Sequence, residues 1–123
     1  MSIRGRRILF VDDDDDLRYL VNIWLSSQSY EVTTAQNGAA ALELAEKSPP
    51  NLILLDMRMP VMDGWAFARV YRQRPGPHAP IVVLTAARDA AERAADIAAD
   101  GYLGKPFDLN ELLTVVGQHT AQR

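Results

Sequence analysis

The chain has 123 residues, no cysteine and a formal net charge of −3, and its length fits one domain, over residues 1–123, with a core of its own. The absence of cysteine excludes a disulfide framework, a thiolate metal site and a cysteine nucleophile, so oxygen ligands are the expected metal chemistry. The charge gives no reason to expect nucleic acid as a partner, and no apolar run approaches the length of a membrane span, which predicts a cytoplasmic protein without membrane contact.

Short apolar runs separated by helix-length segments predict an α/β fold with a parallel sheet. Three runs, over residues 8–11, 52–55 and 81–84, have the composition of buried parallel strands. Shorter strands are expected over residues 31–35 and 101–104. Five strand-and-helix units then account for the whole chain.

Helical spacing of apolar residues predicts one helix after each strand. The expected helices cover residues 17–25, 38–47, a segment around 67–71 that stops before the proline-rich loop 75–80, and residues 90–99 and 109–116. The helix over residues 90–99 is dominated by alanine and offers only Ile97 as a large apolar side chain. We therefore expect this helix to be weakly anchored.

Four of the predicted strands end at polar residues that suit phosphate chemistry. These residues are Asp12 with Asp13, Asp56, Thr85 and Lys105. Ligands of open parallel sheets bind beyond the carboxyl ends of the strands, so we expect these side chains to converge. Three carboxylates repel one another unless a cation neutralises them, and an all-oxygen site suits Mg²⁺. With the ion bound, a carboxylate can attack a phosphoryl group and form an aspartyl phosphate.

The same residues belong to an ordered set of motifs that runs through most of the chain. The motifs are Val11-Asp12-Asp13, Asp56 with Met59-Pro60 and Met62-Asp63-Gly64 after it, Leu84-Thr85-Ala86, and Tyr102 three residues before Lys105-Pro106-Phe107. Together they resemble the receiver domain of bacterial two-component response regulators, including chemotaxis receivers. The resemblance implies a flavodoxin-like, doubly wound α/β fold. In this fold five helices cover a five-stranded parallel sheet of strand order 2-1-3-4-5.

The resemblance also implies a role for each residue of the acidic cluster. Asp56 matches the phosphoacceptor. Asp12 and Asp13 match the acidic pair that holds Mg²⁺, with Mn²⁺ as a substitute ion, and Asp56 joins them as a ligand. Arg58 matches the position whose backbone carbonyl completes the protein ligands.

A second group of residues is implied to bind the phosphoryl group and to switch. Lys105, the Thr85 hydroxyl and the Ala86 backbone match the phosphate-binding groups. The Lys105–Pro106 peptide bond would be cis, so Pro106 would be a cis-proline. Thr85 and Tyr102 match the pair that moves on phosphorylation and repacks the surface of the fourth helix, last strand and last helix.

The function implied is a signalling switch rather than a turnover enzyme. Its phosphoryl group would come from a sensor histidine kinase or a histidine phosphotransfer protein. Its output would pass to a downstream protein or output domain, and the resemblance allows a phosphorylation-dependent homodimer. The domain would catalyse only its own phosphoryl transfer and dephosphorylation.

Two other functions fit part of the pattern. A Mg²⁺-dependent phosphatase of the haloacid dehalogenase type would use Asp12 as the nucleophile and Asp14 as the general acid. That reading leaves the Lys105-Pro106-Phe107 motif unexplained, and the chain lacks residues for a substrate-selecting cap. A receiver-like module that binds partners without phosphate is the other alternative, against which the complete acidic set argues.

A few positions depart from the pattern of the family or leave a role open. Asp14 occupies the place where the family often has Glu, and Ala98 the place where it frequently has Gly. Arg58 and Ala87 lie two residues past Asp56 and Thr85, where side chains can guide or block the water that hydrolyses the phosphoryl group. His78 and His119 are expected to have structural or solvent roles rather than to carry phosphate.

Overall fold

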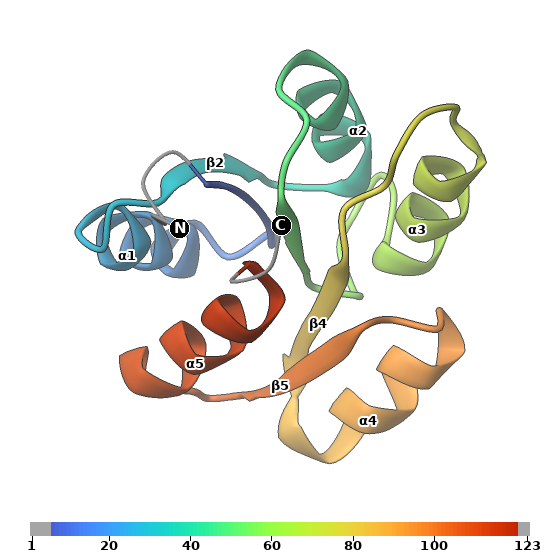
Figure 1. Ribbon diagram of the computed structural model, residues 1–123. Coiled ribbons are helices and arrows are strands. Elements are labelled where there is room, and N and C mark those ends of the chain that lie inside the picture. Colours follow the sequence, from blue (N-terminus) through green and yellow to red (C-terminus); the bar gives the residue numbers. More distant parts are fainter. Residues whose placement is uncertain (1–5, 121–123) are drawn as a thin grey trace.

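The structure is a computed structural model that describes residues 6–120. Five parallel strands form one sheet in the order β2-β1-β3-β4-β5, which confirms the predicted topology (Figure 1). The strands are β1 (Arg7–Val11), β2 (Glu31–Ala35), β3 (Leu52–Leu55), β4 (Ile81–Ala86) and β5 (Gly101–Lys105). β1 and β3 are buried along almost their whole length, as expected for central strands that helices cover on both faces.

The helices lie on both faces of this sheet. They are α1 (Asp15–Ser26), α2 (Gly38–Lys47), α3 (Gly64–Gln73), α4 (Ala87–Asp96) and α5 (Leu109–Thr120). α1 and α5 cover one face, and α2, α3 and α4 cover the other (Figure 1). No helix within residues 6–120 is long and apolar enough to cross a membrane.

Short polar side chains define where several helices begin. The carboxylate or amide oxygens of Asp14, Asn37 and Asp63 accept backbone N–H groups in the first turns of α1, α2 and α3. At the start of α5, Asp108 and Glu111 each accept the other's backbone N–H, which forms a capping box. These caps fix the helix ends that face the carboxyl edge of the sheet.

The fourth helix begins earlier than its apolar pattern predicts. α4 starts at Ala87 rather than residue 90 and ends at Asp96 rather than residue 99, and β4 runs directly into it. Its buried face consists of two alanines, Ala90 and Ala94, with Ile97 just past its end. The apolar anchor is therefore as small as expected.

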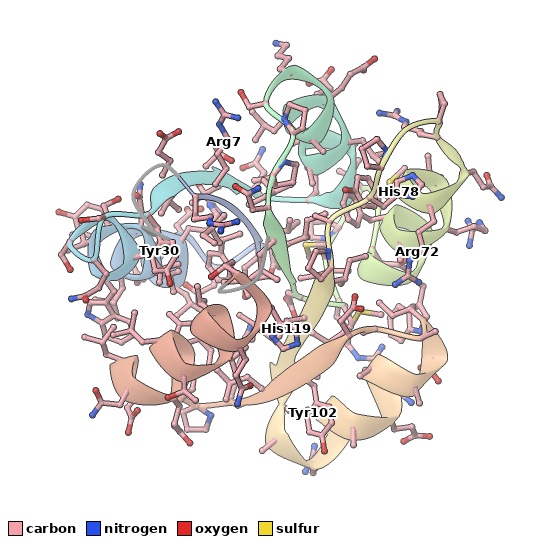
Figure 2. The ribbon with its side chains drawn as sticks, in the orientation of Figure 1. Arg7, Tyr30, Arg72, His78, Tyr102 and His119 are labelled. Carbon is pink, nitrogen blue, oxygen red and sulfur yellow. The ribbon has the colours of Figure 1, made fainter. Side chains whose placement is uncertain are left out.

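Polar contacts from α3 add to the anchoring of α4. The Arg72 guanidinium donates to the backbone carbonyls of Ile97 and Ala98, directly after α4, the latter at 3.2 Å. Figure 2 shows Arg72 on the side of α3 that faces the end of α4. Apolar periodicity does not reveal such contacts, so the prediction of a weakly anchored helix was incomplete.

A strained turn precedes α3, close to the carboxyl edge. Val61 has a φ of 71°, and the Met62 N–H donates to the Pro60 carbonyl at 2.8 Å, which closes a γ-turn around Val61. A β-branched residue rarely adopts a positive φ because its side chain crowds the backbone. The Val61 side chain is 84% exposed, so it contributes little packing in return.

Replacing Val61 with Gly should therefore stabilise the protein by about 1 kcal/mol, because Gly adopts this φ without strain. Urea unfolding midpoints of the wild type and variant measure the effect. Val61→Ala is the matched control, since it shortens the same exposed side chain but keeps the Cβ atom. Equal midpoints for the Gly and Ala variants would show that the turn stores no strain.

Candidate functional site

Four strand ends bring the predicted side chains to one edge of the sheet. Asp12 directly follows β1, Asp56 directly follows β3, and Lys105 is the last residue of β5. Thr85 lies within β4, beside Gly104 of β5 in the parallel register, and is buried. The residues thus meet where ligands of parallel α/β sheets bind.

Lys105 is paired with the most deeply buried carboxylate of this edge. Its Nζ lies 2.7 Å from Oδ2 of Asp12 and 3.8 Å from Oδ1 of Asp56. The Asp12 side chain is only 1% exposed, and its Oδ1 accepts the backbone N–H of Asp14 at 3.0 Å. Both oxygens of Asp12 therefore have partners, which leaves Asp56 as the less neutralised of the two buried carboxylates.

Asp56 has the properties of a nucleophile with weak solvation. The pKa of its carboxyl is raised from 3.8 to about 6, mainly by burial and further by repulsion from the carboxylates of Asp12 and Asp13. The Lys105 ammonium and the Met57 N–H, which donates to Oδ1 of Asp56 at 2.9 Å, lower the pKa. At pH 7 the carboxylate form dominates, and this is the form that attacks phosphorus.

Three carboxylates are close enough together to share one cation. One oxygen from each of Asp12, Asp13 and Asp56 lies within 4.8 Å of the other two. Asp13 is exposed, so the cluster opens to solvent on one side. Hard oxygen donors with room for water suit Mg²⁺, and the repulsion of Asp56 by Asp12 and Asp13 is relieved when a cation binds between them. The donor set therefore fits the expected ion.

The rest of the acidic run belongs to the start of α1. Oδ1 of Asp14 accepts the backbone N–H of Leu17 at 3.1 Å, which makes Asp14 the N-cap of the helix. Asp15 forms an ion pair with Arg18, one turn further along. Both side chains therefore bind groups at the start of α1 and are not part of the carboxylate cluster.

The remaining predicted residues lie around this centre. The Lys105–Pro106 peptide bond is cis, as the resemblance implies. Tyr102 is 53% exposed and projects from β5 on the side of α4 (Figure 2). The Arg58 side chain is exposed, and its guanidinium carbon lies 5.4 Å from the centre of the Trp65 ring. Ala86, next to Thr85, pairs with Lys105 in the sheet register.

The two histidines lie far along the chain from the acidic cluster and make local contacts. Nε2 of His78 lies 2.8 Å from the Arg74 carbonyl, and Nδ1 of His119 lies 2.9 Å from the Val115 carbonyl, one turn earlier in α5. These contacts agree with the structural roles expected for both residues.

Two side chains near the site were not anticipated from the sequence. Nη1 of Arg18 donates to the backbone carbonyl of Asp12 at 2.8 Å and so supports the turn that carries the acidic pair. Its spacing of three residues from Asp15 is the only signal that the sequence offers for it. Trp65, which contacts Arg58, is the other, and no sequence pattern singled it out.

Comparisons with known proteins agree with this geometry. A family model described as the response regulator receiver domain matches residues 8–117. The response regulator MprA of Mycobacterium sp. (strain KMS) is 45% identical over 109 residues, which cover 87% of this chain and 47% of that protein. The transcriptional regulatory protein GltR of Pseudomonas aeruginosa is 38% identical over 116 residues, which cover 92% of this chain and 48% of that protein. The chain thus spans about half the length of these curated relatives.

Solved structures give the same result. A putative response regulator from Chloroflexus aurantiacus has a TM-score of 0.87 and 33% sequence identity, with 97% of this chain and all of that chain covered (100%). The receiver domain of the sensor histidine kinase PA1611 from Pseudomonas aeruginosa has a TM-score of 0.84 and 32% identity, with 96% of this chain and 99% of that chain covered. That structure has a magnesium ion coordinated in the active site cleft.

These comparisons give no support to the phosphatase alternative. Asp14, the general acid that it requires, caps α1 instead. The receiver domain assignment agrees with the matched region, with the strand order and with the carboxylate cluster. The chain belongs to the response regulator receiver domain family of two-component systems.

Proposed function

We propose that the domain is a phosphorylation-dependent signalling switch in which Asp56 is the phosphoacceptor. The observation that carries this proposal is the burial and the charge environment of the Asp56 carboxylate. It is buried, its pKa is raised to about 6, and it lies beside a lysine that is already paired with another carboxylate. A poorly solvated carboxylate with two acidic neighbours is suited to covalent catalysis at phosphorus.

The reaction follows from the groups around Asp56. Its free carboxylate oxygen attacks phosphorus, and the bond from phosphorus to the nitrogen of the donor histidine breaks, with the electron pair returning to that nitrogen. Lys105, now paired with Asp12, would turn to the transferred phosphoryl group, because its Nζ is already 3.8 Å from Asp56. The Thr85 hydroxyl and the Ala86 backbone N–H would bind other phosphoryl oxygens.

Asp12, Asp13, Asp56 and the backbone carbonyl of Arg58 would hold the metal ion, which is Mg²⁺ or, as a substitute, Mn²⁺. When bound, the ion supplies positive charge that offsets the charge of the phosphoryl oxygens. Hydrolysis by water restores the Asp56 carboxylate and releases phosphate, so the domain would act only on its own phosphoryl group.

Incubation with acetyl phosphate and Mg²⁺ tests the proposal. Borohydride reduces an aspartyl phosphate to homoserine, so peptide mass spectrometry locates the modified residue. We expect one modified residue, Asp56. Modification of Asp12 would contradict the proposed role of Asp56, and an unmodified protein that keeps its fold would favour the phosphate-independent binding module.

A shallow apolar groove beside Lys105 supports docking of a protein donor. The groove has a volume of about 390 Å³. Its lining comes from α1 and from the segment around the cis-proline: Leu17, Leu20, Trp24, Ala86, Lys105, Pro106 and Phe107. Since Lys105 belongs both to the groove and to the site, a partner seated there would reach Asp56. We infer that a histidine kinase or histidine phosphotransfer protein binds this groove.

Leu20→Glu should slow phosphoryl transfer from the protein donor by at least about tenfold, because it places a charge in an apolar contact. Labelling by acetyl phosphate should be unchanged, since the small donor needs no groove. Tyr19→Glu is the matched control, because Tyr19 is the neighbouring residue, is 71% exposed and does not line the groove. An equal loss with both donors would place the effect of Leu20 in the fold and not in docking.

The output of the switch would pass through the surface of α4, β5 and α5. Thr85 immediately precedes the end of β4, which runs into α4, and Tyr102 projects beside that helix. Movement of Thr85 toward the phosphoryl group would therefore displace α4 and change the packing of Tyr102. This surface would control a downstream protein or an output domain, or form a homodimer, in a cytoplasmic signalling pathway.

A further inference from the structure

The Trp65 side chain joins the segment after Asp56 to the last turn of α4. Trp65 is the second residue of α3, and its indole Nε1–H donates to Oδ2 of Asp96, the last residue of α4, at 3.1 Å. Nε of Arg93 lies 2.9 Å from the same Asp96 oxygen. The Arg93 guanidinium carbon is also 5.7 Å from the centre of the Trp65 ring. Asp96 is thus shared between an indole N–H and a guanidinium.

The same ring also binds the arginine that follows the phosphoacceptor by two residues. The Arg58 guanidinium carbon lies 5.4 Å from the ring centre, within the range of cation–π attraction. Arg58 does not form an ion pair with Asp56, because in the described residues 6–120 Lys105 is the only cation whose nitrogen lies within 4.0 Å of the Asp56 carboxylate. One aromatic side chain therefore contacts both the loop after Asp56 and the end of α4.

The opposite end of α4 is attached more directly to the site. Thr85 is two residues before the first residue of α4, with no loop between β4 and the helix, and no side chain caps that end. A Cβ atom on Gly104 would lie only 2.5 Å from Cα of Ala87, so the first turn packs tightly on β5. A displacement of Thr85 must therefore pass into α4. Since a ten-residue helix is a stiff body about 15 Å long, its last turn moves as well.

We propose that Trp65 is a positioning residue that holds α4 in its unphosphorylated position through the bond to Asp96. This inference rests on the proposed function of Asp56. Movement of α4 on phosphorylation has to lengthen or break the indole bond, which therefore favours the unphosphorylated state. Loss of the bond should make the phosphorylated conformation easier to reach, because a contact present in only one of two states shifts the equilibrium between them.

Beryllofluoride, a phosphoryl mimic, tests this inference on the full chain. Its apparent affinity is measured in the presence of Mg²⁺ by following the backbone amide signal of Met57, whose N–H donates to Asp56. Trp65→Phe removes the indole N–H but keeps a ring for Arg58. We expect Trp65→Phe to bind beryllofluoride roughly fivefold more tightly than the wild type. Tyr19→Phe is the control and should leave the affinity unchanged, because it removes a polar group from an aromatic side chain of α1 that is 71% exposed and does not line the groove.

Two further measurements separate positioning from a general effect on the fold. Asp96→Ala should raise the affinity like Trp65→Phe, and the double variant should gain little beyond either single change, because both substitutions remove the same indole bond. Asp96→Ala also removes an ion pair with Arg93, but that pair lies within α4 and moves with the helix. In the wild type, the indole N–H signal of Trp65 should shift and exchange faster with solvent when beryllofluoride binds.

Unchanged affinity in Trp65→Phe, or additive gains in the double variant, would overturn the role of Trp65 while the Met57 signal still reports adduct formation. A Met57 signal that does not respond in the wild type would overturn the proposed function, and the inference with it.

Discussion

Replacing Asp56 with Asn should abolish phosphoryl labelling and, without metal, make the folded protein more stable at pH 8. Burial is the main reason that the pKa of Asp56 rises from 3.8 to about 6, so the ionised side chain opposes folding. The difference between these two values corresponds to about 3 kcal/mol of unfolding free energy. Asn keeps the size of the side chain and an oxygen for the Met57 N–H but carries no charge.

The sign of the pH dependence follows from which state binds the proton more tightly. Folded Asp56 takes up its proton near pH 6, whereas unfolded Asp56 does so near 3.8. The wild type therefore regains the lost stability as the pH falls from 6 toward 4, and the advantage of Asp56→Asn shrinks over the same range. The stability advantage of Asp56→Asn is complete well above pH 6, where Asp56 is ionised in both the folded and the unfolded state.

Urea unfolding in EDTA at pH 8 and pH 4 measures this dependence. Asp16→Asn is a suitable control, since Asp16 is an exposed aspartate in the first turn of α1. Added Mg²⁺ should stabilise the wild type more than the Asn variant, because the ion neutralises the carboxylate cluster. An Asp56→Asn protein that is no more stable than the wild type at pH 8 would mean that the buried carboxylate is not electrostatically strained.

Replacing Lys105 with Met should destabilise the metal-free protein by about 2–3 kcal/mol. The substitution leaves the Asp12 carboxylate, whose side chain is 1% exposed, without the ammonium 2.7 Å away. Loss of one partner of a buried ion pair costs roughly 3–5 kcal/mol, and the 27% exposure of the Lys105 side chain reduces this figure. The pKa of Asp56 should also rise further above 6, because the Lys105 charge lowers it.

Mg²⁺ should restore most of the stability of Lys105→Met but not its response to phosphorylation. The ion can replace the lost positive charge, whereas it cannot replace the side chain that turns to the phosphoryl group. Hydrogen exchange of α4 with and without beryllofluoride measures that response. Lys47→Met is the control, because Lys47 is an exposed lysine on the last turn of α2. Equal stability of Lys105→Met and the wild type in EDTA would contradict the proposed dependence of Asp12 on Lys105.

The parts of the fold that depend on apolar pattern were predictable from the sequence. The bounds Glu31–Ala35 and Gly38–Lys47 agree with the structure, because apolar spacing and flanking turn residues mark both segments. The meeting of Asp12, Asp56 and Lys105 at one edge also follows, since the carboxyl ends of parallel strands lie together. The strand order came instead from the resemblance to receiver domains. The chemical types of those side chains then restrict what the edge can bind.

The start of α4 was less predictable because alanine gives no boundary signal. Thr85 and Ala86 continue β4 by two residues, and the helix begins at once without a capping side chain. Ala98, where the family frequently has Gly, has a φ of 50°, so it adopts the left-handed conformation that favours Gly. The backbone keeps its conformation although the residue that suits it best is absent.

Polar contacts between side chains on different helices were not predictable from the sequence. Trp65 and Asp96 are 31 positions apart, and either side chain alone is compatible with an ordinary solvent-exposed helix face. The role of Asp14 as a helix cap also needs coordinates, because five identical residues follow β1 and only Asp12 and Asp13 have a role implied by the resemblance. These contacts depend on how the helices lie on the sheet and not on local pattern.

A crystal structure of the protein with Mg²⁺ and beryllofluoride tests the central claim most directly. We predict beryllium bonded to a carboxylate oxygen of Asp56, with the Lys105 ammonium moved from Asp12 to a fluoride and the Thr85 hydroxyl turned toward the adduct. Beryllium on Asp12, or an adduct on Asp56 with Lys105 still paired to Asp12 and Thr85 unmoved, would contradict the account of this site as a phosphorylation switch.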